Sequence, residues 1–320
     1  MTSSDAWQPR DRVVPFSSFE PLVGEFRNSL TKIGIAISPG GALDKLCDLT
    51  VRLARRMLSQ SEQESPEALE GIAGFITFAA KVVEVSAHTD FAQLTDHLKL
   101  LESGKIKINS PDTDHKKEGP KLFELLMALS AFHIGSNIKL DDPAGGSQGT
   151  NPDILADIDK QRWGIACKLL YGSIGLTVKR ATEKGIDQIE RCAATTGVVV
   201  LSLNNLLDHT AIRGDITQGW PGIDKPLQLM RDTVELKKKQ LKAEFSDVEL
   251  NGLFAGKKAL PVILLYTHAM TVVKSAVDSR PIPTLLRFLS QIPFGDTSAG
   301  IITLTRLNLS LQDQPDMAQS

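Results

Sequence analysis

Cysteine is scarce in this chain of 320 residues, which contains Cys47, Cys167 and Cys192 and no others. No two of them are closely spaced, and none takes part in a pattern typical of zinc ligation. The spacing therefore indicates neither a disulfide framework nor a zinc site, and it favours a reducing compartment. The six histidines are equally scattered and lack the close spacing of metal ligands.

Long apolar runs are also missing. The amino-terminal segment MTSSDAWQPRDR has no apolar stretch typical of a secretory signal, and the longest apolar runs elsewhere are about strand length. The sequence therefore predicts a cytoplasmic protein with no membrane partner. It also lacks a P-loop, a dinucleotide-binding glycine fingerprint and a G-x-S-x-G element, so it gives no support to those nucleotide-binding and hydrolase classes.

The chain has little excess charge of either sign. Its formal net charge is −2 and its pI is near 6.3, so the overall charge does not favour nucleic acid as a partner. A DNA-binding protein of this charge needs a local basic face. The composition, 42% hydrophobic and 23% charged, is that of a globular protein, and the length allows about two domains.

Residues 1–108 are predicted to form a helical region. Apolar residues recur at helical spacing through 43–54 and again through 67–86, where Pro66 is suited to a helix start. A shorter helix is expected over 91–101. The polar and charged segment 103–119 is typical of a boundary, and we expect the chain to change character there.

Residues 109–320 are predicted to form an α/β core with a carboxyl-terminal extension. Apolar strands alternate with amphipathic helices in this part of the chain, which predicts a mixed sheet with helices on both faces. The expected helices are 120–134, 178–196 and 225–245, and the expected strands are 137–140, 154–158, 163–167, 198–203 and 259–266.

The segment NPDILADIDKQRWGIACK, residues 151–168, is the most informative part of the sequence. Two apolar-alternating runs flank a polar turn, which predicts a β-hairpin. Antiparallel pairing brings the start of the first strand beside the end of the second, so Asp153 and Lys168 are expected to meet. A carboxylate beside an ammonium at a sheet edge suits a divalent metal and a phosphate.

This hairpin resembles the PD-(D/E)XK signature of restriction-endonuclease-like nucleases, with Asp153 opening the first strand and Lys168 closing the second. The flanking elements are similar to that family as well. Upstream is a helix with an embedded glutamate, Glu124. Downstream is a helix carrying Gln188 and Glu190, followed by a buried strand.

The resemblance covers about residues 116–206 and implies a restriction-endonuclease-like core. It implies an enzyme that uses Mg²⁺ or Mn²⁺ to hydrolyse DNA phosphodiester bonds. Asp153 would be a catalytic metal ligand, and Lys168 would place the attacking water. Glu124 would supply a further catalytic and metal-binding carboxylate, and Gln188 would assist at the phosphate.

The second acidic position of the signature is occupied here by Ala166. Its backbone carbonyl remains a hard oxygen ligand, and Mg²⁺ needs few protein ligands when waters complete its shell. Alternatively, a carboxylate from another element occupies the same space. The candidates are Glu124 from the helix before the sheet, and Glu190 or Glu183 from the helix after it.

The missing acid also fits a different class of protein. In this alternative, the core is a catalytically degenerate restriction-endonuclease-like domain that binds nucleic acid or a partner protein. A plain interaction protein built on the helical half is a third alternative, and the sequence allows a homodimer in any of these cases.

The densest positive stretch contains Lys237, Lys238, Lys239 and Lys242 on one predicted helix. If this helix borders the Asp153 end of the sheet, its lysines are placed to follow a phosphate backbone. A solvated helix face, balanced by Glu235 and Glu244, is the alternative interpretation.

Overall fold

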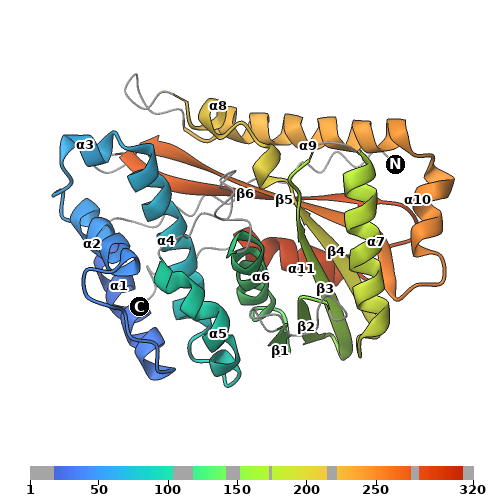
Figure 1. Ribbon diagram of the computed structural model, residues 1–320, viewed down its shortest axis with the longest axis horizontal. Helices are drawn as coiled ribbons and strands as arrows, with labels where there is room; N and C mark the ends of the chain where they lie inside the picture. Colours follow the sequence, from blue (N-terminus) through green and yellow to red (C-terminus); the bar gives the residue numbers. More distant parts are fainter. Residues whose placement is uncertain are drawn as a thin grey trace.

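The fold is of the α/β class. One sheet of parallel and antiparallel strands has helices on both faces, and a helical region lies at one side of it (Figure 1). The computed structural model describes residues 18–103, 118–141, 152–172, 175–214, 222–274 and 281–312. Within these ranges the α/β class expected from the sequence is confirmed. The expected boundary near residues 108 and 109 falls outside them.

The sheet has six strands in the order β1-β2-β3-β4-β5-β6. The first three form an antiparallel meander, β4 and β5 are parallel to β3, and β6 returns antiparallel to β5. The strands are β1 (Ser136–Leu140), β2 (Ile154–Ile158), β3 (Gln161–Leu169), β4 (Thr196–Ser202), β5 (Ala259–Lys274) and β6 (Pro281–Pro293).

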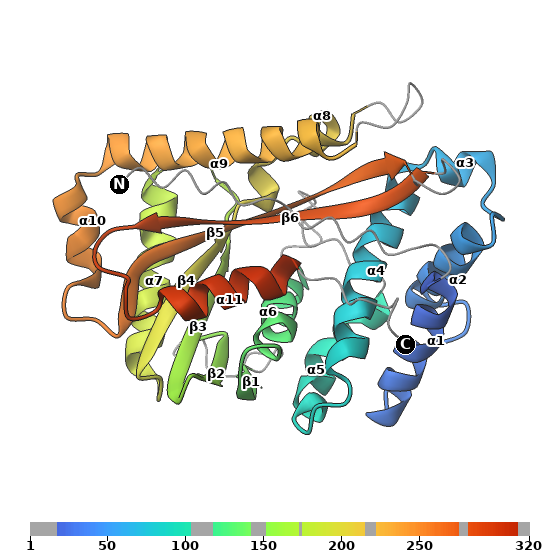
Figure 2. The same cartoon turned by 180° about the vertical axis from the view of Figure 1, so that it is seen from behind.

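Helices cover the central strands from both sides. Alternate residues of β3 enter different cores, because successive side chains of a strand point to opposite faces. Ile165 and Cys167 join the core beneath α6 and α11, whereas Ala166 joins the core beneath α7, α9 and α10. Figure 2 shows α11 lying on the same side of the sheet as α6. These helices are α6 (Glu118–Ala131), α7 (Gly175–Arg191), α8 (His209–Arg213), α9 (Asp224–Glu244), α10 (Asp247–Phe254) and α11 (Ile301–Gln312).

The amino-terminal region is helical over residues 18–103 and shares its core with the sheet. One cluster of buried side chains runs from Phe19 in the first helix to Leu311 in α11. The helix α4 packs on the long hairpin of β5 and β6, where its Leu69 meets Met270. The helices are α1 (Phe19–Lys32), α2 (Ala42–Ala54), α3 (Gln60–Gln63), α4 (Pro66–Val85) and α5 (Thr95–Leu98), with short 3-10 turns at Phe91–Leu94 and Lys99–Ser103.

The hairpin of β2 and β3 is tighter than the sequence predicted. Its turn consists of Asp159 and Lys160, whose φ angles are 50° and 65°, so both adopt the left-handed conformation of a two-residue hairpin turn. The polar turn was expected to extend to Arg162, but that residue belongs to β3. The Asp159 carboxylate accepts hydrogen bonds from Thr303 at 2.9 Å and Arg306 at 2.7 Å, which fixes the turn to α11.

The carboxyl-terminal part contains elements that the sequence did not predict. The strand expected over 259–266 extends to Lys274, and β6 and α11 follow where only a mixed tail was expected. Pro283 and Pro293 lie in β6, and proline argues against a central strand. Because β6 is an edge of the sheet, a missing N–H on its outer side costs no ladder hydrogen bond. Within the ranges described above, no helix is long and apolar enough to cross a membrane.

The close packing of α7 against β3 and β4 predicts a strong effect of adding one methyl group at Gly197. A Cβ there would lie 2.4 Å from the Gly164 carbonyl oxygen and 2.8 Å from Ile189, so Gly197→Ala must displace backbone. We expect a loss of about 1–3 kcal/mol in the free energy of unfolding, measured by urea denaturation.

Gly24→Ala is the matched control for this prediction. Gly24 lies within α1 with nothing inside 4 Å of its would-be Cβ, so alanine should stabilise that helix by up to about 1 kcal/mol. Equal unfolding midpoints for the two variants would show that the β3–β4 contact is not tightly packed.

Candidate active site

Asp153 and Lys168 meet at one end of the hairpin, as the sequence predicted. The register pairs Ile154 with Ile165, which sets Asp153 beside the last residues of β3. The Oδ2 atom of Asp153 accepts hydrogen bonds from the Cys167 backbone N–H at 2.6 Å and from the Lys168 Nζ at 2.8 Å. The pairing of β2 with β3 thus places a carboxylate and an ammonium group in direct contact.

The carboxylate of Asp153 is buried, which disfavours its charged form. Its residue is only 6% exposed. Burial raises the pKa of the Asp153 carboxyl above its usual value, the Lys168 ammonium opposes this rise, and the nearby Glu124 carboxylate adds to it. A buried carboxylate of this kind binds either a proton or a cation readily.

Glu124 supplies the second carboxylate of the site from α6. It is 3% exposed, and its Oε2 accepts a hydrogen bond from the Lys121 Nζ at 2.8 Å. Burial lowers the pKa of Lys121, but the attraction of Glu124, joined by that of Asp153 and Asp141, outweighs burial and raises this pKa overall. Glu124 also raises the pKa values of Asp153 and of Cys167, so the two carboxylates share one neighbourhood.

The carboxylates open onto a cavity of about 530 Å³ at the carboxyl end of β3. The first half of α7 forms its other wall, where Arg180 and Lys184 are exposed. With Lys168 these cations outnumber the two acidic residues of the wall. The cavity is lined by Pro120, Glu124, Asp153, Cys167, Lys168, Leu169, Leu170, Tyr171, Gly172, Thr177, Arg180, Ala181 and Lys184.

Ala166 is covered by α7 rather than facing this cavity. It is fully buried, and a Cβ on Gly185 would lie 3.3 Å from the Ala166 Cβ and 2.9 Å from Val199. A glutamate at position 166 would therefore collide with the helix. The close approach of α7 at Gly185 accounts for a small residue where the resemblance led us to expect an acid.

Glu190 lies at the other end of α7, so the prediction that it joins Asp153 is not supported. Its carboxylate accepts a hydrogen bond from the backbone N–H of Lys258 at 2.5 Å, at the start of β5. The Lys258 ammonium donates to the Glu190 carbonyl at 3.0 Å. The residue holds α7 to the beginning of β5 and does not line the cavity. Glu183, on the same helix, does not line it either.

Gln188 lies one turn beyond Lys184 on α7 and is 6% exposed. Its Oε1 atom is buried without a hydrogen-bond partner. Gln188 is not part of the cavity wall, so the structure does not place it at a phosphate.

His97 is a neighbour of the site that sequence reasoning missed. It comes from α5, is 2% exposed, and has its Nε2 atom 3.8 Å from the Glu124 Oε2. That nitrogen is buried and has no hydrogen-bond partner. Nothing in the spacing of the histidines pointed to it, because the contact joins the helical region to α6 across a long sequence separation.

The lysines expected to bind nucleic acid lie on α9, whose end borders the cavity wall. Glu244 at the end of α9 accepts the Gly175 backbone N–H at 3.0 Å, at the start of α7. Two of the four lysines are engaged: Lys237 donates to Gln240, and Lys238 pairs with Glu235. Lys239 and Lys242 are exposed.

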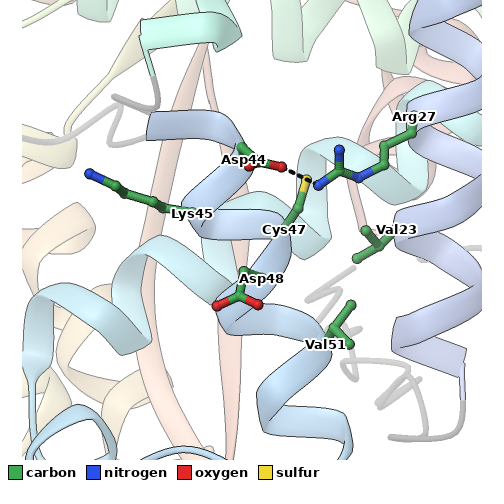
Figure 3. Close-up of a pocket in the computed structure, with 7 residues that line it drawn as sticks. All are labelled: Val23, Arg27, Asp44, Lys45, Cys47, Asp48 and Val51. Atoms are coloured by element: carbon green, nitrogen blue, oxygen red, sulfur yellow. Dashed lines mark hydrogen bonds and ion pairs between the residues drawn. The ribbon is translucent and has the colours of Figure 1, made fainter. Parts of the chain in front are cut away.

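A second cavity, of about 410 Å³, lies between α1 and α2 (Figure 3). Arg27 and Asp44 point toward each other across it and form an ion pair. Cys47 is fully buried there, and burial raises the pKa of its thiol to about 11. A thiol with so high a pKa is not a nucleophile at neutral pH, so this cavity has no catalytic group of that kind.

In the part of the chain that the structure describes, no group of three or more His, Cys, Asp or Glu side chains is arranged to hold a metal ion. Comparison with protein-family models, with curated proteins and with solved structures gives no match. The chemistry of the Asp153 cavity is therefore argued from its own residues.

The buried Asp153 carboxylate predicts an unusual pH dependence of stability. Because folding raises its pKa, its contribution to stability is fully present below the unfolded pKa and is lost as the pH rises through the folded pKa. Asp153→Asn removes this loss, so the melting temperature of the variant should rise relative to that of wild type as the pH rises above the unfolded pKa of an aspartic acid, about 4. Each unit of pKa is worth about 1.4 kcal/mol, or roughly 2 °C or more in a chain of this size.

Asp157→Asn is the control of opposite sign. Asn137, and with it Arg162, lowers the pKa of Asp157, so that carboxylate adds stability above its unfolded pKa. The melting temperature of this variant should fall relative to wild type over the same rise in pH, as measured by calorimetry. Parallel curves for the two variants would contradict the burial effect at Asp153.

Proposed function

We propose that this protein is a metal-dependent nuclease with a restriction-endonuclease-like core that hydrolyses DNA phosphodiester bonds. The observation that carries the proposal is the convergence of Asp153, Glu124 and Lys168 on one cavity. The order α6-β1-β2-β3-α7-β4, with its antiparallel meander followed by a parallel strand, supports the resemblance on which the proposal builds.

Mg²⁺ or Mn²⁺ fits the donors that the cavity offers. Asp153 and Glu124 are buried carboxylates, which are hard oxygen ligands, and an ion held by two of them keeps several waters. Carboxylate and water ligands suit Mn²⁺ as well as Mg²⁺. When bound, such an ion lowers the pKa of a ligated water and polarises a phosphoryl oxygen.

Lys168 has two roles in this proposal, and Lys121 shares the first of them. Without an ion, their ammonium groups offset the charges of Asp153 and Glu124. With a substrate present, Lys168 lies at the mouth of the same cavity, where it orients the attacking water and offsets the charge that develops on phosphorus. Arg180 and Lys184 bind the flanking phosphates as further fixed positive charges.

The second candidate function is a binding module that has lost catalysis. The observation that favours it is the burial of Ala166 beneath Gly185, which leaves the cavity with one acid fewer than the family signature. Such a module would keep the cations of the cavity and bind nucleic acid or a protein without cutting. The two candidates are distinguished by turnover.

A cleavage assay with plasmid, linear duplex and single-stranded DNA tests the proposal. We expect cleavage with Mg²⁺ or Mn²⁺ and none with EDTA. Asp153→Ala and Lys168→Ala should each reduce the rate by a factor of about 100 or more, since each removes a group that acts at the reacting phosphate. Glu124→Gln should reduce it similarly by weakening metal binding.

Glu190→Gln is the control, because it keeps an acceptor for the Lys258 N–H and lies away from the cavity. It should retain the wild-type rate. DNA binding without turnover in any metal would favour the binding module. A rate that depends on Glu190 as strongly as on Asp153 would contradict the site assignment.

The salt dependence of DNA binding tests the contribution of α9. Each neutralised phosphate contributes about 0.7–0.9 to the slope of log affinity against log salt. Replacing the exposed Lys239 and Lys242 with alanine should lower the slope by up to about 2 units. Lys32→Ala, on an exposed position of α1, should leave the slope unchanged. A weaker affinity with an unaltered slope would show that the α9 lysines do not contact phosphates.

A further inference from the structure

Tyr171 is an exception among the aromatic side chains of this protein. It is 45% exposed, whereas every other Phe, Tyr and Trp in the described ranges is buried or half-buried. It belongs to the wall of the cavity that contains Asp153 and Lys168. An aromatic ring that is left in water at the mouth of a charged cavity points to a planar ligand.

The backbone that presents Tyr171 is fixed on its amino-terminal side. The preceding residue, Leu170, is 2% exposed, and its N–H donates to the Ser202 carbonyl at 3.1 Å. The Leu170 carbonyl accepts a hydrogen bond from the Asn205 side chain at 3.3 Å. The strand end therefore holds Leu170 inward and directs its neighbour outward, which lowers the entropy lost when a ligand contacts the ring.

The cationic residues of the cavity come before and after Tyr171 in the sequence. Lys168 is three residues before Tyr171, and Arg180 and Lys184 follow on the exposed surface of α7. A strand whose phosphate lies at Lys168 and whose next phosphate lies on α7 would carry one nucleobase past Tyr171. The cavity, at about 530 Å³, is the size of a small-molecule site and not of a groove that accepts a double helix.

We propose that the cavity takes an unpaired nucleotide of a single-stranded DNA segment, and that Tyr171 stacks on its base. This inference rests on the proposed nuclease function and specifies its substrate. In a double helix both faces of a base are covered by its neighbours, so a ring at the phosphate level has no face to stack on. A single strand leaves the base free, and stacking on an aromatic side chain then favours single strands of any sequence.

The test compares binding of a fluorescent single-stranded oligonucleotide with binding of a blunt duplex of the same sequence, in EDTA so that no strand is cut. Tyr171→Ala should weaken single-strand binding by a factor of about 5 to 100 and leave duplex binding nearly unchanged. Tyr171→Phe and Tyr171→Trp should bind as wild type does, because both keep an aromatic face. A 2-aminopurine base in the strand should be quenched more strongly by wild type than by Tyr171→Ala.

Leu176→Ala is the matched control. Leu176 is 43% exposed and lies on the first turn of α7. Its replacement by alanine removes apolar surface near the cavity wall without removing an aromatic ring. It should not change the preference for single strands. Melting temperatures of all variants should match that of wild type, since both residues are exposed.

The outcomes separate this inference from the proposed function. Equal losses on single strand and duplex, or a loss in Tyr171→Phe as large as in Tyr171→Ala, would overturn the stacking role while leaving metal-dependent cleavage intact. If wild type cuts duplex DNA faster than single strands, the substrate class proposed here is wrong. If it neither binds nor cuts either form, both the inference and the proposed function fail.

Discussion

The burial of β3 and β4 on both faces is the constraint on which the rest of the structure depends. Every residue of β4 from Gly197 to Ser202 is buried, and β3 is buried from Trp163 to Cys167. Such strands have no room for charged side chains along their length. Chemistry is confined to the strand ends, and Asp153 and Lys168 lie at one of them. Where α7 comes closest, only small residues fit, which explains Ala166 beneath Gly185.

The helical region also contributes to this burial, because its side chains complete the core on which α6 packs. Lys81 of α4 is 1% exposed and donates its ammonium proton to the Ser310 carbonyl of α11 at 2.6 Å. The Ser310 hydroxyl in turn donates to the Ser130 carbonyl of α6 at 2.6 Å. This chain of contacts ties three helices together. Because α6 carries Glu124, the helical region sets the position of one carboxylate of the cavity.

The parts of the site that follow from local pairing could be predicted from the sequence. The alternation of apolar residues placed β2 at its observed bounds, and a hairpin between two such strands requires Asp153 to meet Lys168. The α9 helix was also found, since its amphipathic pattern is long. In each case the signal lies within a short stretch of chain.

The remaining features depend on packing between distant segments, for which a single sequence carries no signal. Glu190 shared a helix with cavity residues, but the direction of α7 carries it to the opposite end. His97 reaches Glu124 only because the helical region packs on α6. The strand β6 was not predicted, because it contains prolines, which are tolerated in an edge strand but are not typical of strands in general.

The pairing of each carboxylate with its own lysine has a thermodynamic consequence. Lys168 and Lys121 act as internal counter-ions, so a divalent cation bound as proposed would have to compete with groups already in place. Under the proposed function, a polyanion would give those ammonium groups a new partner and would release the carboxylates to the cation. Binding of the two ligands would then be linked, and the linkage would be reciprocal: the factor by which the anion raises the affinity for the cation is the factor by which the cation raises the affinity for the anion. The carboxylates would thus be free to hold the cation only when the cation and the polyanion are both present.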